Sequence, residues 1–538
     1  MDKIFYNGVI HTMNGKEVVS ALAVEGGLIR AVGGDEEILK LQTSHTELVD
    51  LQQKLMIPGF NDSHLHLLGY GLNKRRLNLA GCSSVADMIE RGRDYLAQNP
   101  AGGPVLGRGW NQDHFQHPAF PQRQDLDAIS SEQPLIFYRV CGHIAVINSP
   151  ALEYFGIGPA TKCPEGGSFD LQSGLFCENA LDLLDLPAPG PAEIKVLIKE
   201  AAADLLKQGI TSAQSDDFGY AAWRDVVRAY SELAQANELP IRIYQQCLFN
   251  KIEDISHFLH ETSQYAPDQA FYRLGPIKLL SDGALGARTA YLTRPYHDDP
   301  STQGIACFTQ AELDDIVALC QQNGRATAIH CIGDGAAYRA AASIAKARQA
   351  GGAGLRHGIV HCQISDKSLL LKMQELELVA YIQPIFLDYD IHIVEQRVGA
   401  ALARTSYQFK ALHDLGVPLA LGSDCPVEPF DPLPNIYCAV TRQDLRGFPP
   451  GGFNAEQALS VQEAVAAYTS GSAYCSYEEN IKGRLTPGFY ADMTVLDRDI
   501  FCINQHEIKN VCILMTVVAG KVLYRHNCII YAFAGQQI

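Results

Sequence analysis

Apolar residues follow two different patterns along the chain. From about Ala192 onward, short continuous apolar runs alternate with stretches that have the apolar spacing of helices. Continuous apolar strands that alternate with helices are typical of a parallel sheet covered by helices. The predicted strands are 54–60, 209–215, 241–247, 275–283, 325–334, 358–363, 378–384 and 418–424. Eight is the number that closes an α/β barrel of the TIM or (β/α)8 type, which we therefore predict for residues 56–477.

Both ends of the chain instead carry short β-prone pieces separated by turn residues. Asn7-Gly8, Gly26-Gly27 and Gly33-Gly34 are hairpin or turn signals in the first fifty residues. Near the C-terminus, strands are expected around Pro487-Gly488 and Gly520. We expect residues 1–55 and 478–538 to form one small β-sandwich domain into which the barrel is inserted.

The segment from about 68 to 191 does not follow the alternation of the barrel. It contains "LGRGWNQDHF", "LIFYRVCGHIAVINSPAL" and "SGLFCENALDLL", each a mixture of glycine, aromatic and polar residues. Long connections after a barrel strand are often functional. We interpret the segment as an insertion after barrel strand 1 that either builds a lid and much of the substrate pocket or only stabilises the fold.

Composition excludes several classes of partner. The chain has 538 residues, 47% of them hydrophobic, and a formal net charge of -17. Its only short basic run is "NKRRL", so a nucleic-acid partner is not expected. The N-terminus lacks the apolar run of a signal peptide, and no stretch of about 20 apolar residues could cross a membrane. A cytoplasmic protein without a membrane partner is expected, with the 15 cysteines as free thiols because no CxxC pair occurs.

Two histidines follow the first predicted barrel strand in "MIPGFNDSHLHLLG". Residues two apart on a strand point to the same side, so His64 and His66 can hold one metal ion. An HxH sequence by itself is equally compatible with two ordinary polar residues.

Four further candidates lie at or near the ends of other predicted strands, where the active sites of such barrels form. They are Lys278, His330, His361 and Asp424. Neutral imidazoles and a carboxylate suit zinc and related divalent ions. The amine of Lys278 can add carbon dioxide and bridge two ions as a carbamate; alternatively, Lys278 forms a buried ion pair with Asp282 or Asp424.

The order of these residues resembles the amidohydrolase superfamily. The phrases "PGFNDSHLH", "IKLLSDGALG", "AIHCIGD", "RHGIVHCQ" and "LGSDCPVEPFDP" look like its YtcJ-like branch, amidohydrolase family 3, which includes N-substituted formamide deformylases. The resemblance implies His64 and His66 on one ion and His330 and His361 on a second. It also implies Lys278 as a carbamylated bridge and Asp424 as ligand and proton shuttle. The cysteines that follow His330 and His361 depart from the family pattern, but neither departure changes a ligand residue.

The expected function is hydrolysis of a carbon–nitrogen bond, an amide or formamide, in a small molecule by metal-activated hydroxide. The cofactor is one or two divalent ions, with zinc expected. A deaminase or an ester or lactone hydrolase can use the same site, and a non-hydrolytic isomerase or ligand-binding protein can use the same fold. The last class would be expected to lose Lys278 or Asp424, and both are present.

Other residues are assigned from local context. His143 is a candidate to stabilise the oxyanion or, equally, a buried histidine bonded to a carbonyl. Candidate substrate-binding residues are Trp110, which can instead belong to the core, Asp113, and Arg288, which can instead cap a helix or pair with Asp282. Asp334 is predicted to cap a helix and Asp62 to orient the HxH turn. A homodimer is expected only as the commonest oligomer.

Overall fold

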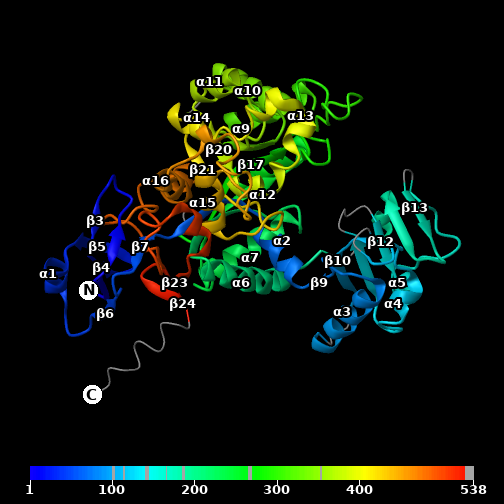
Figure 1. Cartoon of the computed structure of the whole chain (residues 1–538), viewed down its shortest axis with the longest axis horizontal. Coiled ribbons are helices and arrows are strands. Elements are labelled where there is room, and N and C mark those ends of the chain that lie inside the picture. The colour runs from blue at the N-terminus through cyan, green and yellow to red at the C-terminus, as the bar shows by residue number, and fades with distance from the viewer. Residues whose placement is uncertain are drawn as a thin grey trace. The chain divides into compact units, whose positions relative to one another are not determined.

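The structure, a computed structural model, describes residues 1–99, 103–112, 115–139, 144–164, 167–184, 188–263, 270–351 and 354–526. The chain divides into two compact units, which Figure 1 shows coloured along the sequence. One unit consists of Met1–Gly69 and Gly190–Ile538, and the other is Tyr70–Pro189.

A parallel sheet of eight strands forms the centre of the first unit. In sheet order these are β8 (Phe60–Leu65), β15 (Ile210–Asp216), β16 (Arg242–Leu248), β17 (Tyr272–Leu280), β18 (Thr327–Cys331), β19 (Gly358–His361), β20 (Val379–Ile382) and β21 (Leu419–Leu421). Every residue of β15 is buried, as expected for a strand packed on both faces. The sheet is a TIM-type barrel, which confirms the predicted central fold.

Backbone hydrogen bonds join the two edge strands of the barrel just beyond β21. The N–H of Asp424 donates to His64 O, and the N–H of His66 donates to Cys425 O, each over 2.7 Å. The close approach requires a glycine at position 422, because a Cβ there would lie 2.6 Å from the backbone nitrogen of His64. Barrel closure thus brings the eighth strand's end directly against the HxH segment.

Helices follow the strands along the chain. Between residue 190 and β20 these are α6 (Pro191–Lys207), α7 (Trp223–Gln235), α8 (Ile252–Thr262), α9 (Gln310–Gln322), α10 (Asp334–Gln349) and α11 (Lys367–Glu375). Between β20 and β21 lie α12 (Leu387–Asp390), α13 (Val394–Ala403) and α14 (Phe409–Asp414), and after β21 lie α15 (Pro432–Thr441), α16 (Val461–Ala466) and α17 (Ser472–Cys475). In the part of the chain that the structure describes, no helix has the length and apolar character needed to cross a membrane.

Helix α6 shows how the sequence specifies these elements. It begins at Pro191, whose fixed φ suits the first turn of a helix. Ile194, Leu197, Ile198 and Ala201 recur at helical spacing and are all buried, so one face packs on the fold.

The chain ends form two further sheets. The first has the order β5 (Leu28–Gly33), β4 (Ala21–Glu25), β1 (Lys3–Tyr6) and β6 (Glu47–Asp50). The second has the order β24 (Lys521–Arg525), β23 (Ile513–Val518), β22 (Met493–Leu496), β7 (Leu55–Pro58), β2 (Val9–His11) and β3 (Val18–Val19). Strands from both ends therefore lie in one sheet.

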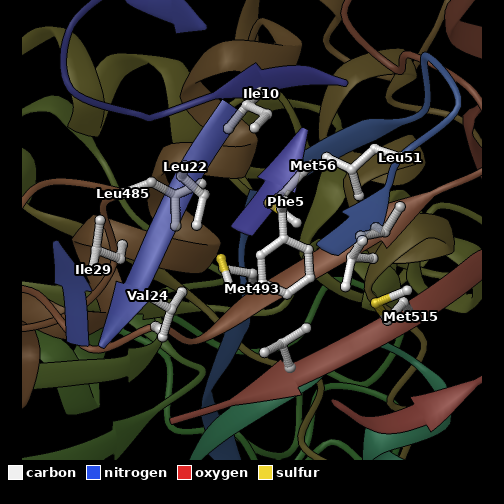
Figure 2. Packing of buried hydrophobic residues seen from close by; sticks show 14 of the residues in the cluster. Phe5, Ile10, Leu22, Val24, Ile29, Leu51, Met56, Leu485, Met493 and Met515 are labelled. Atoms are coloured by element: carbon white, nitrogen blue, oxygen red, sulfur yellow. The ribbon is translucent and has the colours of Figure 1, made fainter. Parts of the chain in front are cut away.

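Side chains from these two sheets meet in one apolar cluster. Figure 2 shows Phe5 and Leu22 of the first sheet close to Met56, Met493 and Met515 of the second. Residues separated by more than four hundred positions in sequence thus share a core.

The structure corrects two details of the sequence prediction. Residues 54–60 do not form the first barrel strand: β7 pairs with β2 and β22 in the terminal sheet, and the barrel strand β8 begins at Phe60. Gly59 separates the two strands, where a Cβ would lie 2.2 Å from the Thr211 hydroxyl. Asn7-Gly8, predicted as a hairpin or a turn, forms a bend between β1 and β2 but no hairpin, because these strands belong to different sheets. Gly26-Gly27 does join the antiparallel pair β4 and β5.

The unit Tyr70–Pro189 has its own mixed sheet. The order is β13 (Gly167–Asp170), β14 (Leu175–Glu178), β12 (Ile144–Ile147), β11 (Leu135–Arg139), β10 (Val105–Trp110) and β9 (Leu77–Asn78). Helices α3 (Val85–Gln98), α4 (Arg123–Asp127) and α5 (Ser149–Tyr154) accompany it. Two apolar clusters include alternate residues of β11, with Phe137 in one and Ile136 in the other, so this sheet is packed on both faces.

The cysteines that the structure describes are free thiols, as predicted. Most of them are buried, including Cys331 and Cys362. Burial raises the pKa of Cys362 above its usual range, so this residue is a neutral thiol within the fold.

His357, directly before β19, provides a test of how the barrel responds to pH. Nδ1 accepts the backbone N–H of Thr327, and Nε2 lies 2.9 Å from Gln321 Oε1, so the ring is held neutral. Burial, with a smaller effect of Arg348, lowers the pKa of His357 to about 4. The unfolded chain binds this proton near pH 6.5, so the contribution to stability is complete above that pH and is lost as the pH falls toward 4.

We expect this residue to reduce the free energy of unfolding by up to about 3 kcal/mol between pH 7 and pH 4. Urea unfolding of His357→Asn should show a weaker dependence on pH over this range than the wild type, although the variant is less stable. Substitution of the exposed His413 serves as the control, and the free energy of unfolding should then depend on pH as strongly as in the wild type. Equal slopes for His357→Asn and the wild type would contradict the assignment.

Candidate metal centre

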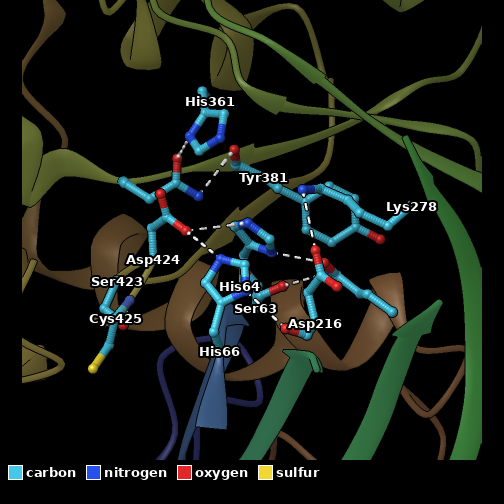
Figure 3. A network of polar contacts seen from close by, with 12 residues as sticks. Ser63, His64, His66, Asp216, Lys278, His361, Tyr381, Ser423, Asp424 and Cys425 are labelled. Carbon is cyan, nitrogen blue, oxygen red and sulfur yellow. Dashed lines mark hydrogen bonds and ion pairs between the residues drawn. The ribbon is translucent and has the colours of Figure 1, made fainter. Parts of the chain in front are cut away.

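Titratable side chains meet at the C-terminal ends of the barrel strands. His64 lies near the end of β8, Lys278 in β17, His330 in β18 and His361 at the end of β19. Asp424 follows β21 and reaches the same place through the backbone bonds that close the barrel. Figure 3 shows His64, His66, Lys278, His361 and Asp424 close together. Lys278, Asp424 and the histidines at 64 and 361 are buried, whereas His66 and His330 are partly exposed.

The imidazole rings are close enough to act together as ligands of one metal site. Ring centroids are 5.3 Å apart for His64 and His66, 5.7 Å for His64 and His361, and 4.4 Å for His330 and His361. The structure thus brings all four histidines of the prediction into one cluster.

Each of these rings has one nitrogen fixed by a neighbour. His64 Nδ1 lies 2.7 Å from Gln246 Oε1, and His361 Nδ1 lies 2.8 Å from Gln383 Oε1. His66 Nδ1 lies 2.7 Å from the backbone oxygen of Asp216. His330 is held by its other nitrogen, since Nε2 lies 3.1 Å from the backbone oxygen of Gly283.

Asp424 faces the free nitrogens of the HxH pair. Its Oδ1 lies 3.1 Å from His66 Nε2 and 3.3 Å from His64 Nε2 (Figure 3). Burial alone would raise the pKa of Asp424, but the adjacent His64 and His66 hold that pKa well below its usual range. Asp424 is therefore a carboxylate at neutral pH.

The four histidines differ in charge. Burial lowers the pKa of His66, but Asp424 and Asp216 reverse this effect and raise it to about 9. Burial, with the charge of Lys278, lowers the pKa of His330 to about 3, and burial also lowers the pKa values of His64 and His361. Without a metal ion, the charged pair is His66 with Asp424, and the other three rings are neutral.

The donor set fits a divalent metal ion. One ligand atom each from His64, His361 and Asp424 lies within 4.8 Å of the others. The buried Nε2 of His64 has no hydrogen-bond partner, although it faces the Asp424 carboxylate. A neutral nitrogen and a carboxylate oxygen that face each other both present lone pairs, and a cation between them removes the repulsion. The resemblance had assigned the two histidines of this trio to different ions.

Two of these residues have unusual backbone conformations. φ is 82° at His361 and 61° at Asp424, in the left-handed region that side chains other than glycine seldom adopt. Such conformations cost on the order of 1–3 kcal/mol and cluster at functional sites. The strain places both side chains in the cluster.

Lys278 pairs with a carboxylate that the sequence analysis did not consider. Its Nζ lies 3.5 Å from Asp216 Oδ2, and each side chain is only 1% exposed. The partner is neither Asp282 nor Asp424, so that alternative was wrong in its partner but correct about a buried ion pair. The second oxygen of Asp216, Oδ1, has no hydrogen-bond partner.

Asp282 instead organises the loops beside His330. It accepts hydrogen bonds from the backbone N–H groups of Tyr291, Ile332 and Gly333. Burial raises the pKa of Asp282 to about 7 despite these bonds. Its Oδ1 lies 3.3 Å from His330 Nε2.

The remaining predicted residues have varied outcomes. Asp62 accepts the N–H groups of His64 and Ser423, which supports its orienting role. Asp334 is the first residue of α10, but Gly333 occupies the cap position. The carboxylate of Asp334 instead accepts hydrogen bonds from the backbone N–H and the hydroxyl of Thr293. Arg288 is paired with Asp298 instead of Asp282.

Three predicted pocket residues belong to the unit Tyr70–Pro189. Trp110 is fully buried in an apolar cluster, and its indole N–H donates to Phe137 O, as expected of a core residue. Asp113 and His143 lie outside the described residues.

Sequence reasoning missed Asp216, Gln246 and Gln383, which contact the cluster. All three are polar residues within or directly after predicted strands: Asp216 follows the run 209–215, and the others lie in "IRIYQQC" and "LVAYIQP". A polar residue near the end of an otherwise apolar barrel strand was the available signal.

Comparison with known proteins agrees with this geometry. Residues 47–524 match the family described as the amidohydrolase family. The chain belongs to the amidohydrolase family. Family membership and the histidine and carboxylate cluster together support a metal-dependent hydrolase.

Individual amidohydrolase relatives align over almost the whole chain. The Bacillus subtilis (strain 168) protein named "Putative amidohydrolase YtcJ" is 31% identical, over 98% of this chain and 100% of its own length. The N-substituted formamide deformylase of Arthrobacter pascens is 24% identical, over 98% of this chain and 99% of its own. An uncharacterized metal-dependent hydrolase from Pyrococcus horikoshii OT3 has a similar structure, with a TM-score of 0.79 and 29% identity over 94% of this chain and 99% of that one.

Proposed function

We propose that this protein hydrolyses a carbon–nitrogen bond, an amide or formamide, in a small molecule. The observation that carries the proposal is the buried trio of His64, His361 and Asp424, in which an unpaired imidazole nitrogen faces a carboxylate. Zinc is the proposed ion because imidazole and carboxylate ligands suit it. The similarity to a formamide deformylase supports the choice of bond.

The protein residues have distinct roles in this proposal. His64, His66, His330 and His361 are the proposed imidazole ligands, with Asp424 as a further ligand. A divalent ion held by these residues would polarise a carbonyl and would lower the pKa of a water molecule toward 7. Asp424 takes a proton from the attacking water and gives it to the leaving nitrogen, while the C–O bond forms and the C–N bond breaks. Its low pKa means that it is ionised at neutral pH, which is the form that can accept a proton.

Lys278 is the proposed bridge between two ions. Its neutral amine would add carbon dioxide, forming an N–C bond and releasing one proton, and the resulting carbamate would offer two oxygens as ligands. In the metal-free site Lys278 Nζ instead lies 3.5 Å from Asp216 Oδ2. His143 remains the proposed stabiliser of the oxyanion, and Asp113 a proposed substrate-binding residue.

Removal of metal is expected to abolish hydrolysis. Protein treated with a chelator should lose activity on N-formyl, N-acyl and cyclic amides, and zinc or manganese should restore it. The same panel should contain matched esters, lactones and aromatic amines, because preferential turnover of those would replace the amide proposal with an esterase or a deaminase. Turnover that continues unchanged in protein shown to be metal-free would refute the metal-dependent mechanism.

Metal analysis of two histidine variants localises the site. His361→Ala should bind less zinc than the wild type. His413→Ala is a matched control, because His413, Asp414 and Glu463 form the other described group with metal-ligand spacing but lie largely at the surface. Zinc content that falls only in His413→Ala would place the ion elsewhere.

A further inference from the structure

Two buried glutamines lie against two of the proposed ligands. Gln246 belongs to β16 and Gln383 directly follows β20, and their side chains are at most 2% exposed. Each places its Oε1 within 2.8 Å of a histidine Nδ1, Gln246 at His64 and Gln383 at His361.

Neighbouring carbonyls fix the orientation of both amides. Gln246 Nε2 donates to Ser63 O over 3.0 Å, and Gln383 Nε2 donates to Tyr381 O over 3.4 Å. The amide groups must therefore turn their oxygens toward the imidazoles. An amide oxygen only accepts hydrogen bonds, so the proton of each ring must reside on Nδ1 and donate to the glutamine.

This arrangement determines which nitrogen can bind a metal. A neutral imidazole with its proton on Nδ1 has its lone pair on Nε2. In His64 that Nε2 is the buried atom without a hydrogen-bond partner, 3.3 Å from Asp424 Oδ1. We propose that Gln246 and Gln383 are positioning residues that hold His64 and His361 as Nδ1–H tautomers, so that both Nε2 lone pairs are free to bind metal in the proposed site. This inference rests on the proposed metal site.

The glutamines differ from the groups that orient the other two rings. His66 and His330 lie against backbone oxygens of Asp216 and Gly283, which no substitution removes. The Nδ1 atoms of His64 and His361 instead face side-chain amides, which a substitution does remove. An amide also fixes the tautomer without adding negative charge to a site that already contains Asp216 and Asp424.

Substitution by leucine tests the role of each amide. Gln246→Leu and Gln383→Leu remove the acceptor but retain similar bulk, and zinc affinity measured by chelator competition should fall about 10–100-fold. Gln246→Glu and Gln383→Glu keep an acceptor oxygen, so they should retain or increase the affinity.

Gln245→Leu is the matched control. Gln245 is equally buried next to Gln246, but its amide donates to Ser215 O and Gln246 O and makes no hydrogen bond to an imidazole among the residues that the structure describes. We expect zinc affinity within about twofold of the wild type and a loss of thermal stability similar to that of Gln246→Leu. Equal zinc affinities for Gln245→Leu and the two histidine-facing leucine variants would overturn the proposal.

A second measurement separates this proposal from the proposed function. In metal-free protein labelled with ¹⁵N-histidine, nitrogen chemical shifts should report Nδ1–H tautomers for His64 and His361, and each leucine variant should lose that preference at the ring it faces. If this result holds but the wild type binds no divalent ion, the metal-dependent function fails while the positioning role stands. If the wild-type rings carry the proton on Nε2, the positioning role fails whatever the metal content.

Discussion

Asp424→Asn is expected to lower kcat/KM by about 10³-fold for any substrate that the protein hydrolyses, with the zinc form compared in both proteins. A positioned acid or base contributes about 10²–10⁴-fold to catalysis, and an asparagine can neither accept the proton of the attacking water nor return it to the leaving nitrogen. The exchange also removes the negative charge that faces His64 and His66, so zinc affinity should decrease as well.

Steady-state kinetics at saturating zinc separates the two effects. Added zinc compensates for weaker zinc binding. The decrease in kcat/KM that remains is therefore due to the missing acid–base group. Asp414→Asn is the control, since Asp414 is an exposed carboxylate paired with Lys410 and should leave kcat/KM unchanged. Activity of Asp424→Asn within a few-fold of the wild type would exclude Asp424 as the proton shuttle.

Lys278→Met is expected to destabilise the metal-free protein by about 3–5 kcal/mol, because it leaves Asp216 as a buried charge without its partner. Lys278 and Asp216 are each 1% exposed, so water cannot replace the lost ammonium. The double variant Lys278→Met/Asp216→Asn should recover most of this loss, since it removes both charges together.

Urea unfolding of the two single variants and the double variant provides this cycle. Lys195→Met offers a control at the surface: Lys195 pairs with Glu232 over 2.7 Å, but both side chains are about one third exposed, and the expected change is below about 1 kcal/mol. A double variant as unstable as the sum of its two single changes would show that Lys278 and Asp216 do not stabilise each other.

The local patterns of the sequence predicted the barrel strands accurately. Seven of the predicted runs overlap β15 to β21, because a strand buried on both faces must be continuously apolar whatever its neighbours are. The ligand candidates followed from the same pattern, since polar residues at strand ends stand out against apolar runs. The first strand was misplaced, because "KLMIPGF" is apolar both where it joins the terminal sheet and where it enters the barrel.

Pairing between side chains from different strands could not be predicted in this way. The sequence offered Asp282 and Asp424 as partners of Lys278, but Asp216, 62 positions away, is the residue that lies beside it. The role of the two glutamines could not be predicted either, because it depends on which imidazole ring each amide faces. Such contacts depend on the register between neighbouring strands and on the ends of loops.

The sequence by itself determined the fold class, the family and the residue types available for binding a metal, because these depend on apolar periodicity and on short motifs. Only the tertiary structure decided how those residues combine. Barrel closure places Asp424 against His64 and His66, strand register pairs Lys278 with Asp216, and two buried amides fix the rings of His64 and His361. The physical reason is that ligand geometry, proton position and charge pairing change over distances of about an ångström, which apolar periodicity does not specify.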